Sequence, residues 1–104
     1  METSKATNLK ELVKYSDNSI VSTKILENKN GGQTLFAFDK DQKLSEHSTP
    51  FDAIVQIIEG EGEILIAGKA YLVHEGGMII MPANIPHAVN ANKPFKMLLT
   101  MIKG

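Results

Sequence analysis

The chain has 104 residues, a net charge of −1 from 11 basic and 12 acidic side chains, and no cysteine. This length suits one domain with one core, and the balanced charge excludes a basic surface for nucleic acid or an anionic membrane. Disulfide bonds and thiolate sites are excluded, and no apolar run approaches the ~20 residues of a membrane span. Residues 1–8 are polar and have no signal-peptide core, so we expect a loose N-terminus and a cytoplasmic protein.

The N-terminal part of the chain predicts one helical turn at most, followed by a β-hairpin. Asn8 is a suitable N-cap for a single turn over residues 8–13. Residues 20–26 are rich in β-branched side chains and predict a strand. The pair Asn30-Gly31 favours a tight hairpin turn, after which residues 34–38 form the returning strand.

The rest of the chain alternates short apolar runs with turn residues. Residues 39–49 are polar and are expected to be irregular. The runs that predict strands are 52–59, 63–67, 69–73, 78–81, 87–91 and 95–102. With the first hairpin they give about eight or nine short strands at spacings of roughly 8–12 residues, which is typical of an all-β sandwich or barrel.

Two of these strands, at 52–59 and 78–81, are apolar on both faces. A simple sandwich of this size would expose one face of each sheet to water. We therefore expect a filled interior and a second buried surface, and we predict that this surface is a homodimer interface.

The stretch from Gly76 to His87 combines tight turns with a short apolar strand. Pro82 and Pro86 fix the backbone and end the strand at 78–81. His87 therefore emerges at a rigid position beside a buried strand, where its side chain can point into a barrel or sandwich interior. The alternative is a hydrogen-bonded histidine at the edge of the core.

The same stretch resembles the second sequence motif of the cupin superfamily, G(X)5PXG(X)2H(X)3N. Gly76, Pro82 and His87 stand at the spacings of that motif. Asn84 occupies the position of the family's second glycine, and Asn90 lies one place short of the family's asparagine.

Residues 41–60 resemble the first cupin motif, G(X)5HXH(X)3-4E(X)6G. His47 and Gly60 match it. Asp41 replaces the first glycine, Thr49 the second histidine and Ala53 the glutamate. The chain is thus identified as a small cupin whose metal-binding motif is degenerate.

The resemblance implies a double-stranded β-helix, the jelly-roll barrel of cupins, as one domain over residues 1–104, often assembled as a homodimer. It also implies a small-molecule pocket inside the barrel, where the motif residues converge. The residues expected to line this pocket are His47, Thr49, Ala53, Val55, Met81 and His87.

In metal-binding cupins, three histidines and one glutamate hold a divalent metal, commonly Fe, Mn, Ni, Zn or Cu. Only His47 and His87 carry over, and two imidazoles fall short of the three or more ligands that a stable site takes. Gln56 is a candidate third ligand, because a buried amide without a partner costs ~1–3 kcal/mol. Strand alternation, however, points Gln56 away from Ala53. We therefore predict weak metal binding or none.

Three functions remain open at this point. The first is a barrel that holds a small, partly apolar ligand with little or no metal. The second is a cupin enzyme of the dioxygenase, isomerase or decarboxylase type that uses His47 and His87, either with a metal or as a general acid or base. The third is a non-catalytic dimeric interaction module. Fold alone does not decide between them.

Overall fold

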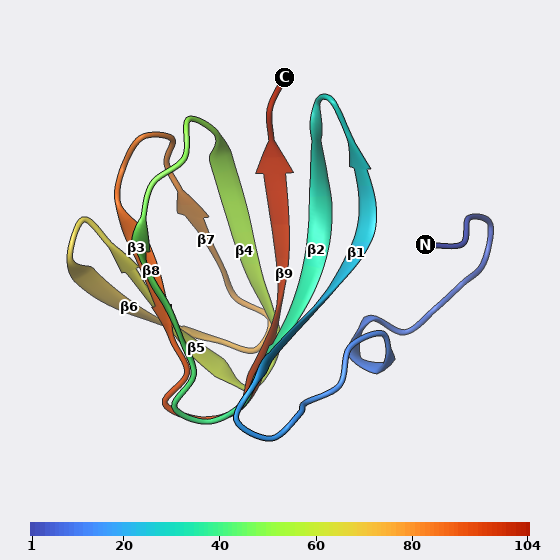
Figure 1. Cartoon of the computed structure of the whole chain (residues 1–104), viewed down its shortest axis with the longest axis horizontal. Helices are drawn as coiled ribbons and strands as arrows, with labels where there is room; N and C mark the ends of the chain where they lie inside the picture. Colours follow the sequence, from blue (N-terminus) through green and yellow to red (C-terminus); the bar gives the residue numbers. More distant parts are fainter.

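Nine antiparallel strands form two facing sheets in the computed structural model, which describes all 104 residues (Figure 1). The five-stranded sheet has the order β1 (Ile20–Asn28), β2 (Gly31–Phe38), β9 (Phe95–Ile102), β4 (Asp52–Glu59) and β7 (Met78–Met81). The four-stranded sheet has the order β3 (Lys43–His47), β8 (His87–Asn90), β5 (Glu61–Ile66) and β6 (Lys69–His74). The prediction of an all-β fold with one short helical turn is confirmed by this architecture.

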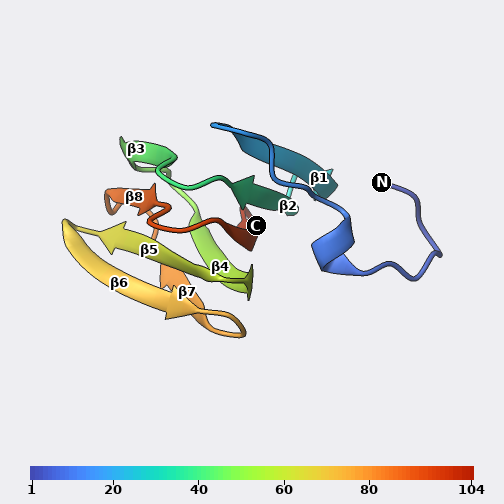
Figure 2. The same cartoon turned by 90° about the horizontal axis from the view of Figure 1, so that it is seen from below.

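The single helical element is a 3₁₀ turn, η1 (Leu9–Glu11), and no helix is long and apolar enough to cross a membrane. Asn8 caps this turn as predicted, because its side chain accepts a hydrogen bond from the backbone N–H of Lys10. Residues 1–8 are exposed and lie away from the barrel (Figures 1 and 2).

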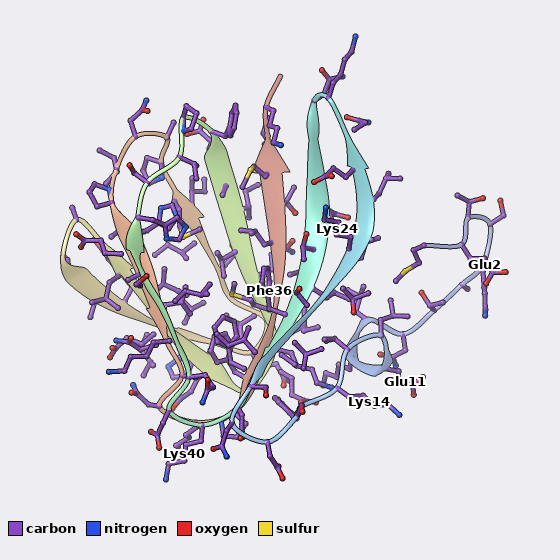
Figure 3. The ribbon with its side chains drawn as sticks, viewed as in Figure 1. Glu2, Glu11, Lys14, Lys24, Phe36 and Lys40 are labelled. Carbon is purple, nitrogen blue, oxygen red and sulfur yellow. The ribbon has the colours of Figure 1, made fainter.

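The two sheets meet at one end and diverge at the other, where the C-terminus lies (Figure 1). Near the closed end, the rings of Phe38 and Phe95 stack with their centroids 4.7 Å apart. Gly62 lies against Phe95, because a Cβ at this position would come within 2.7 Å of the ring. Figure 3 shows Phe36 between the sheets, and its ring lies 6.0 Å from that of Phe38. Stacked aromatic rings and a glycine in close contact therefore close this end of the barrel.

A separate apolar cluster lies on the outer face of the five-stranded sheet, beneath the N-terminal segment. Val13 is buried against this face, and the Nζ atom of Lys96 donates a hydrogen bond of 2.6 Å to the carbonyl oxygen of Lys10. The Tyr15 hydroxyl donates a 2.6 Å bond to Glu59. Burial, reinforced by Glu59, raises the pKa of Tyr15 above its usual range. The buried residues of the cluster are Val13, Leu35, Ala37 and Leu98.

The expectation of an irregular segment at residues 39–49 is wrong, because Lys43–His47 forms β3. This strand pairs with β8, with Lys43 opposite Asn90 and Leu44 opposite Val89. An irregularity interrupts the register between Leu44 and His47. The polar sequence carries little strand propensity of its own, and pairing with a neighbouring strand supplies the hydrogen bonds that hold it extended.

The expectation that the strands at 52–59 and 78–81 are buried on both faces is wrong for the single chain, in which only one face of each strand is buried. In β4 the inward Ala53, Val55 and Ile57 are buried, whereas Gln56 on the other face is exposed. In the edge strand β7, Met78 and Ile80 are 54% and 53% exposed. An apolar strip therefore remains open on the outside of the five-stranded sheet.

Candidate functional site

The two histidines of the motifs stand side by side in the four-stranded sheet. His47 on β3 and His87 on β8 are register partners across the antiparallel pair. Their Nε2 atoms are 3.2 Å apart, and the rings are arranged edge to face with centroids 4.4 Å apart. His87 is only 6% exposed, whereas His47 lies in an exposed part of its strand. The structure thus brings together two residues that are 40 positions apart in the sequence.

Backbone carbonyl groups orient both rings. The Nδ1 atom of His47 lies 2.9 Å from the carbonyl oxygen of Ser45, and the Nδ1 atom of His87 lies 3.3 Å from that of Ile85. A carbonyl oxygen only accepts hydrogen bonds, so each Nδ1 donates and carries the ring's hydrogen. Each Nε2 is then left with a lone pair, and the two lone pairs face each other. Two lone pairs in this arrangement can share a proton, accept a hydrogen bond from a donor, or bind a cation.

The electrostatic environment keeps His87 uncharged. Burial lowers the pKa of His87 below its ordinary value of 6.5. The neighbouring His47 lowers it further, since two positive rings at this distance repel, and the hydrogen bond to Ile85 acts in the opposite direction. At neutral pH, His87 is therefore a neutral imidazole whose Nε2 can accept a proton or bind an electrophile.

A cavity of about 50 Å³ lies between the histidines and the opposite sheet. Five of the six pocket residues predicted from the sequence line it: His47, Thr49, Ala53, Met81 and His87. Val55 does not line it; this residue is fully buried in the core. The remaining lining residues are Leu44, Val89, Met97, Leu99 and Met101. The volume suffices for a few atoms, because one water molecule occupies ~30 Å³ in the liquid.

The wall opposite the histidines is apolar and contains three methionines, two of which flank Ala53. Ala53 on β4 is the register partner of Met81 on β7 and of Met101 on β9. The small side chain of Ala53, which is 2% exposed, therefore lies between two long flexible ones. The Thr49 hydroxyl donates a hydrogen bond to the backbone oxygen of Phe51, so its only hydrogen points to its own loop. No carboxylate lines the cavity.

Gln56 is not a third ligand in this structure. Its side chain belongs to the outer face of β4, where its register partners are Met78 and Leu98, and it is exposed. The alternation along β4 that places Ala53 inside places Gln56 outside. Because the amide is exposed to solvent, it also needs no buried partner. Gln56 as a ligand is therefore a wrong prediction.

Sequence reasoning did not name five of the lining residues: Leu44, Val89, Met97, Leu99 and Met101. Leu44 lies in the segment expected to be irregular, so nothing assigned it to a face. For Val89, alternation along the strand is a usable signal, since His87, which was predicted to point inward, is two positions away.

Comparison with known proteins agrees with this architecture. The Cupin domain family model matches residues 34–102, which contain both histidines and all the strands that line the cavity. The chain belongs to the cupin family.

Solved structures show the same fold. A conserved protein of unknown function from Streptococcus pyogenes is 38% identical to this cupin, with a TM-score of 0.94, and the alignment covers 100% of this chain and 91% of that one. A cupin 2 conserved barrel domain protein from Leptotrichia buccalis is 40% identical, with a TM-score of 0.91, over 93% of this chain and 47% of that one. The salicylate 1,2-dioxygenase of Pseudoaminobacter salicylatoxidans shares only the fold, at 12% identity and a TM-score of 0.74, over 80% of this chain and 26% of that one. None of the curated proteins matches this chain.

The residues of this chain do not fit the divalent metal centre of metal-binding cupins. Nowhere in the structure do three His, Asp or Glu side chains converge. Thr49 and Ala53 offer neither an imidazole nor a carboxylate where the motif has them. A stable site for Fe²⁺, Mn²⁺, Ni²⁺ or Zn²⁺ takes three or more nitrogen or oxygen ligands, and this cavity supplies two imidazoles and a hydroxyl.

Proposed function

We propose that this cupin binds a small, partly apolar molecule in the barrel cavity, with weak or no binding of divalent metals. The observation that carries this proposal is the pair of Nε2 atoms of His47 and His87, 3.2 Å apart, at a cavity whose opposite wall is Ala53, Met81 and Met101. Small-molecule sites usually combine a mostly apolar lining with a few well-placed polar groups.

The histidine pair selects the polar part of the ligand. Neutral Nε2 atoms accept hydrogen bonds from a hydroxyl or a protonated carboxyl group. When the pair takes up one proton, an N–H becomes available and the site attracts a carboxylate. We therefore propose a ligand that carries one hydroxyl or carboxyl group beside His47 and His87, with a short apolar body against the opposite wall.

The cavity volume limits the size of that body. Sites for drug-sized ligands measure ~300–1,000 Å³, whereas this cavity measures about 50 Å³. Methionine side chains are unbranched and flexible, so Met81, Met97 and Met101 can rearrange to enlarge it. A ligand of a few heavy atoms is compatible with the cavity as it stands, and a larger one requires these methionines to move.

Backbone and methyl NMR spectra recorded against a library of small hydroxy and carboxylic acids test the proposal. Binding in the cavity is expected to shift the signals of Ala53, Val89 and Leu99 and to leave those of the exposed Met78 unchanged. His47→Ala removes an exposed side chain and is expected to leave the fold intact while weakening binding at least about tenfold, the loss of one charge-assisted hydrogen bond of ~1.5–3 kcal/mol. Equal affinity in His47→Ala, or shifts confined to other surfaces, would contradict the proposal.

A second candidate is metal-free acid–base catalysis at the same pair, and the lowered pKa of His87 favours it. A general base must be unprotonated at the working pH and within hydrogen-bond reach of the proton that it removes. Turnover of a bound acid that disappears in His87→Asn, with binding retained, would assign His87 this role. Binding without turnover would leave the protein a binding domain.

We also propose that the chain forms a homodimer through the outer face of the five-stranded sheet. Met78, Ile80 and Ile102 are each more than half exposed there. Ile80 lies directly beside the half-buried Ile54 in the register, and Met78 is two residues from Ile80 on the same face, so these side chains form one apolar patch. A second copy that covers this patch would bury apolar surface that one chain leaves in water.

A further inference from the structure

The cavity contains a second group of potential ligands that the family motifs do not include. Besides His47 and His87, it is lined by the thioether side chains of Met81, Met97 and Met101, and by no carboxylate. Imidazole nitrogen is a ligand of intermediate softness, thioether sulfur is a soft one, and neither carries a charge. The site is therefore poorly suited to the divalent ions of metal-binding cupins, and its ligands favour a softer metal ion.

We infer that the cavity binds one Cu(I) ion through Nε2 of His47, Nε2 of His87 and the thioether of Met81 or Met101. This inference goes beyond the proposed small-molecule binding and does not depend on it. It concerns the monovalent ion alone.

The geometry of the histidine pair supports a shared ion. Metal–imidazole bonds are ~2.0–2.1 Å long, so two Nε2 atoms 3.2 Å apart can both reach one ion. The hydrogen bonds from each Nδ1 to the carbonyl oxygens of Ser45 and Ile85 hold the rings in the tautomer that ligation requires. Such backing of a ligating histidine by a backbone carbonyl is common in metal sites.

The position of the methionines supplies the third ligand. Met81 and Met101 flank Ala53, which stands where the family motif has its glutamate. Met81 is only 4% exposed, so its side chain is almost entirely shielded from bulk water. The small side chain of Ala53 and the side chains of Met81 and Met101 all line the same cavity. The position that loses a hard oxygen ligand thus gains two soft sulfur neighbours.

The absence of negative charge in the cavity lining also favours a monovalent ion over a divalent one. Moving an ion from water into an apolar cavity is costly, and the cost rises steeply with charge unless protein charges compensate it. No carboxylate lines the cavity to neutralise a divalent ion. Thioether ligands favour Cu(I) among the first-row metals. Ligand type, ligand position and charge therefore all select the same ion.

Competition with a chromogenic Cu(I) chelator, under anaerobic and reducing conditions, tests the inference on the full chain. The wild type is expected to withdraw one Cu(I) per chain, and its X-ray absorption spectrum is expected to show a sulfur neighbour besides two imidazole nitrogens. The double variant Met81→Leu/Met101→Leu keeps the shape of the cavity wall, since Leu and Met exchange at small cost. It is expected to bind Cu(I) at least about tenfold more weakly and to lose the sulfur signal.

Met78→Leu is the matched control, because Met78 lies on the same strand as Met81 but is 54% exposed on the other face. It is expected to bind Cu(I) like the wild type, and His47→Ala is expected to bind it much more weakly. No Cu(I) uptake by the wild type, or unchanged affinity in the double variant, would overturn the inference. If the double variant does not fold, the two single variants and the wild-type sulfur signal decide the question in the same way. Small-molecule binding measured without copper is a separate result, so the two proposals can fail independently.

Discussion

Ala53→Glu is the change that most directly tests whether the replaced glutamate limits the binding of divalent metals in this barrel. Ala53 is 2% exposed and lies in the wall opposite His47 and His87. A glutamate here adds a carboxylate to the two imidazoles and completes a set of three ligands, which suits Fe²⁺, Ni²⁺ or Mn²⁺. Without metal, the larger side chain overfills a cavity of about 50 Å³, and we expect a loss of ~1–3 kcal/mol in the free energy of unfolding.

Metal should reverse this loss. At a metal concentration of ~100 times Kd, binding to the folded state adds ~2.7 kcal/mol to the free energy of unfolding. For a domain of this size, 1 kcal/mol corresponds to ~4–8 °C in Tm, so the metal should raise the Tm of the variant by roughly 10–20 °C. Thermal unfolding with and without Ni²⁺ and Mn²⁺, together with elemental analysis of the purified variant, measures the effect.

The control is Ala88→Glu, because Ala88 follows His87 on β8 and its side chain points to the other face. This variant adds the same charge close to the site but not in it, and no metal-dependent rise in Tm is expected. If Ala53→Glu gains no more stability from metal than the wild type, the missing glutamate is not what limits metal binding, and our reading of the cavity is wrong.

Four further predictions concern stability and assembly. The pKa of His87 in the folded chain lies below 6.5, so as the pH falls the imidazole is protonated in the unfolded chain before it is protonated in the folded one. The free energy of unfolding should therefore fall below about pH 6.5 by up to ~1.4 kcal/mol per pH unit. Urea unfolding of the wild type and of His87→Asn between about pH 8 and pH 5 should show this slope only in the wild type. Sedimentation should give about twice the chain mass for the wild type and one chain mass for Ile80→Lys, and a monomeric wild type at micromolar concentration would refute the proposed dimer. Val13→Ala should lower the urea midpoint by an amount equivalent to ~1–3 kcal/mol and expose residues 9–13 to hydrogen exchange, and unchanged exchange would show that Val13 does not hold the N-terminal segment. Gly62→Ala places a Cβ 2.7 Å from the ring of Phe95 and should lower the free energy of unfolding by ~1–3 kcal/mol, as measured by denaturant titration, whereas an unchanged midpoint would mean that the ring moves aside freely.

Most of the strands could be predicted from local pattern alone. Alternating or continuous apolar runs between glycine, proline and asparagine identify seven of the nine strands within a residue or two. Of the others, β2 begins three residues before the expected run, because Gly31 and Gly32 pair with Asn28 and Glu27. The strand β3 was missed, because its extended form depends on pairing with β8, which is distant in the sequence.

The histidine pair was predictable, whereas only Ala53 and Met81 of the opposite wall were predicted. His47 and His87 follow from motif spacing, and the structure places their Nε2 atoms 3.2 Å apart. The positions of Met81 and Met101 beside Ala53 depend on the register of β4 with β7 and β9, which local pattern does not specify. The volume of the cavity is even harder to predict from sequence, since it depends on how the side chains of two sheets fill the space between them.

The central place of β9 determines when this barrel can form during synthesis. In the five-stranded sheet, β9 lies between β2 and β4, and it is the last of the nine strands to leave the ribosome. Until then β2 and β4 each present an unpaired edge, and exposed edges are prone to pair with other chains. A nascent chain that stalls before Phe95 therefore lacks both the strand that joins the two halves of the sheet and the ring that stacks on Phe38. Folding of the five-stranded sheet is thus tied to completion of residues 95–102, and the facing edges of β2 and β4 stay open until that point.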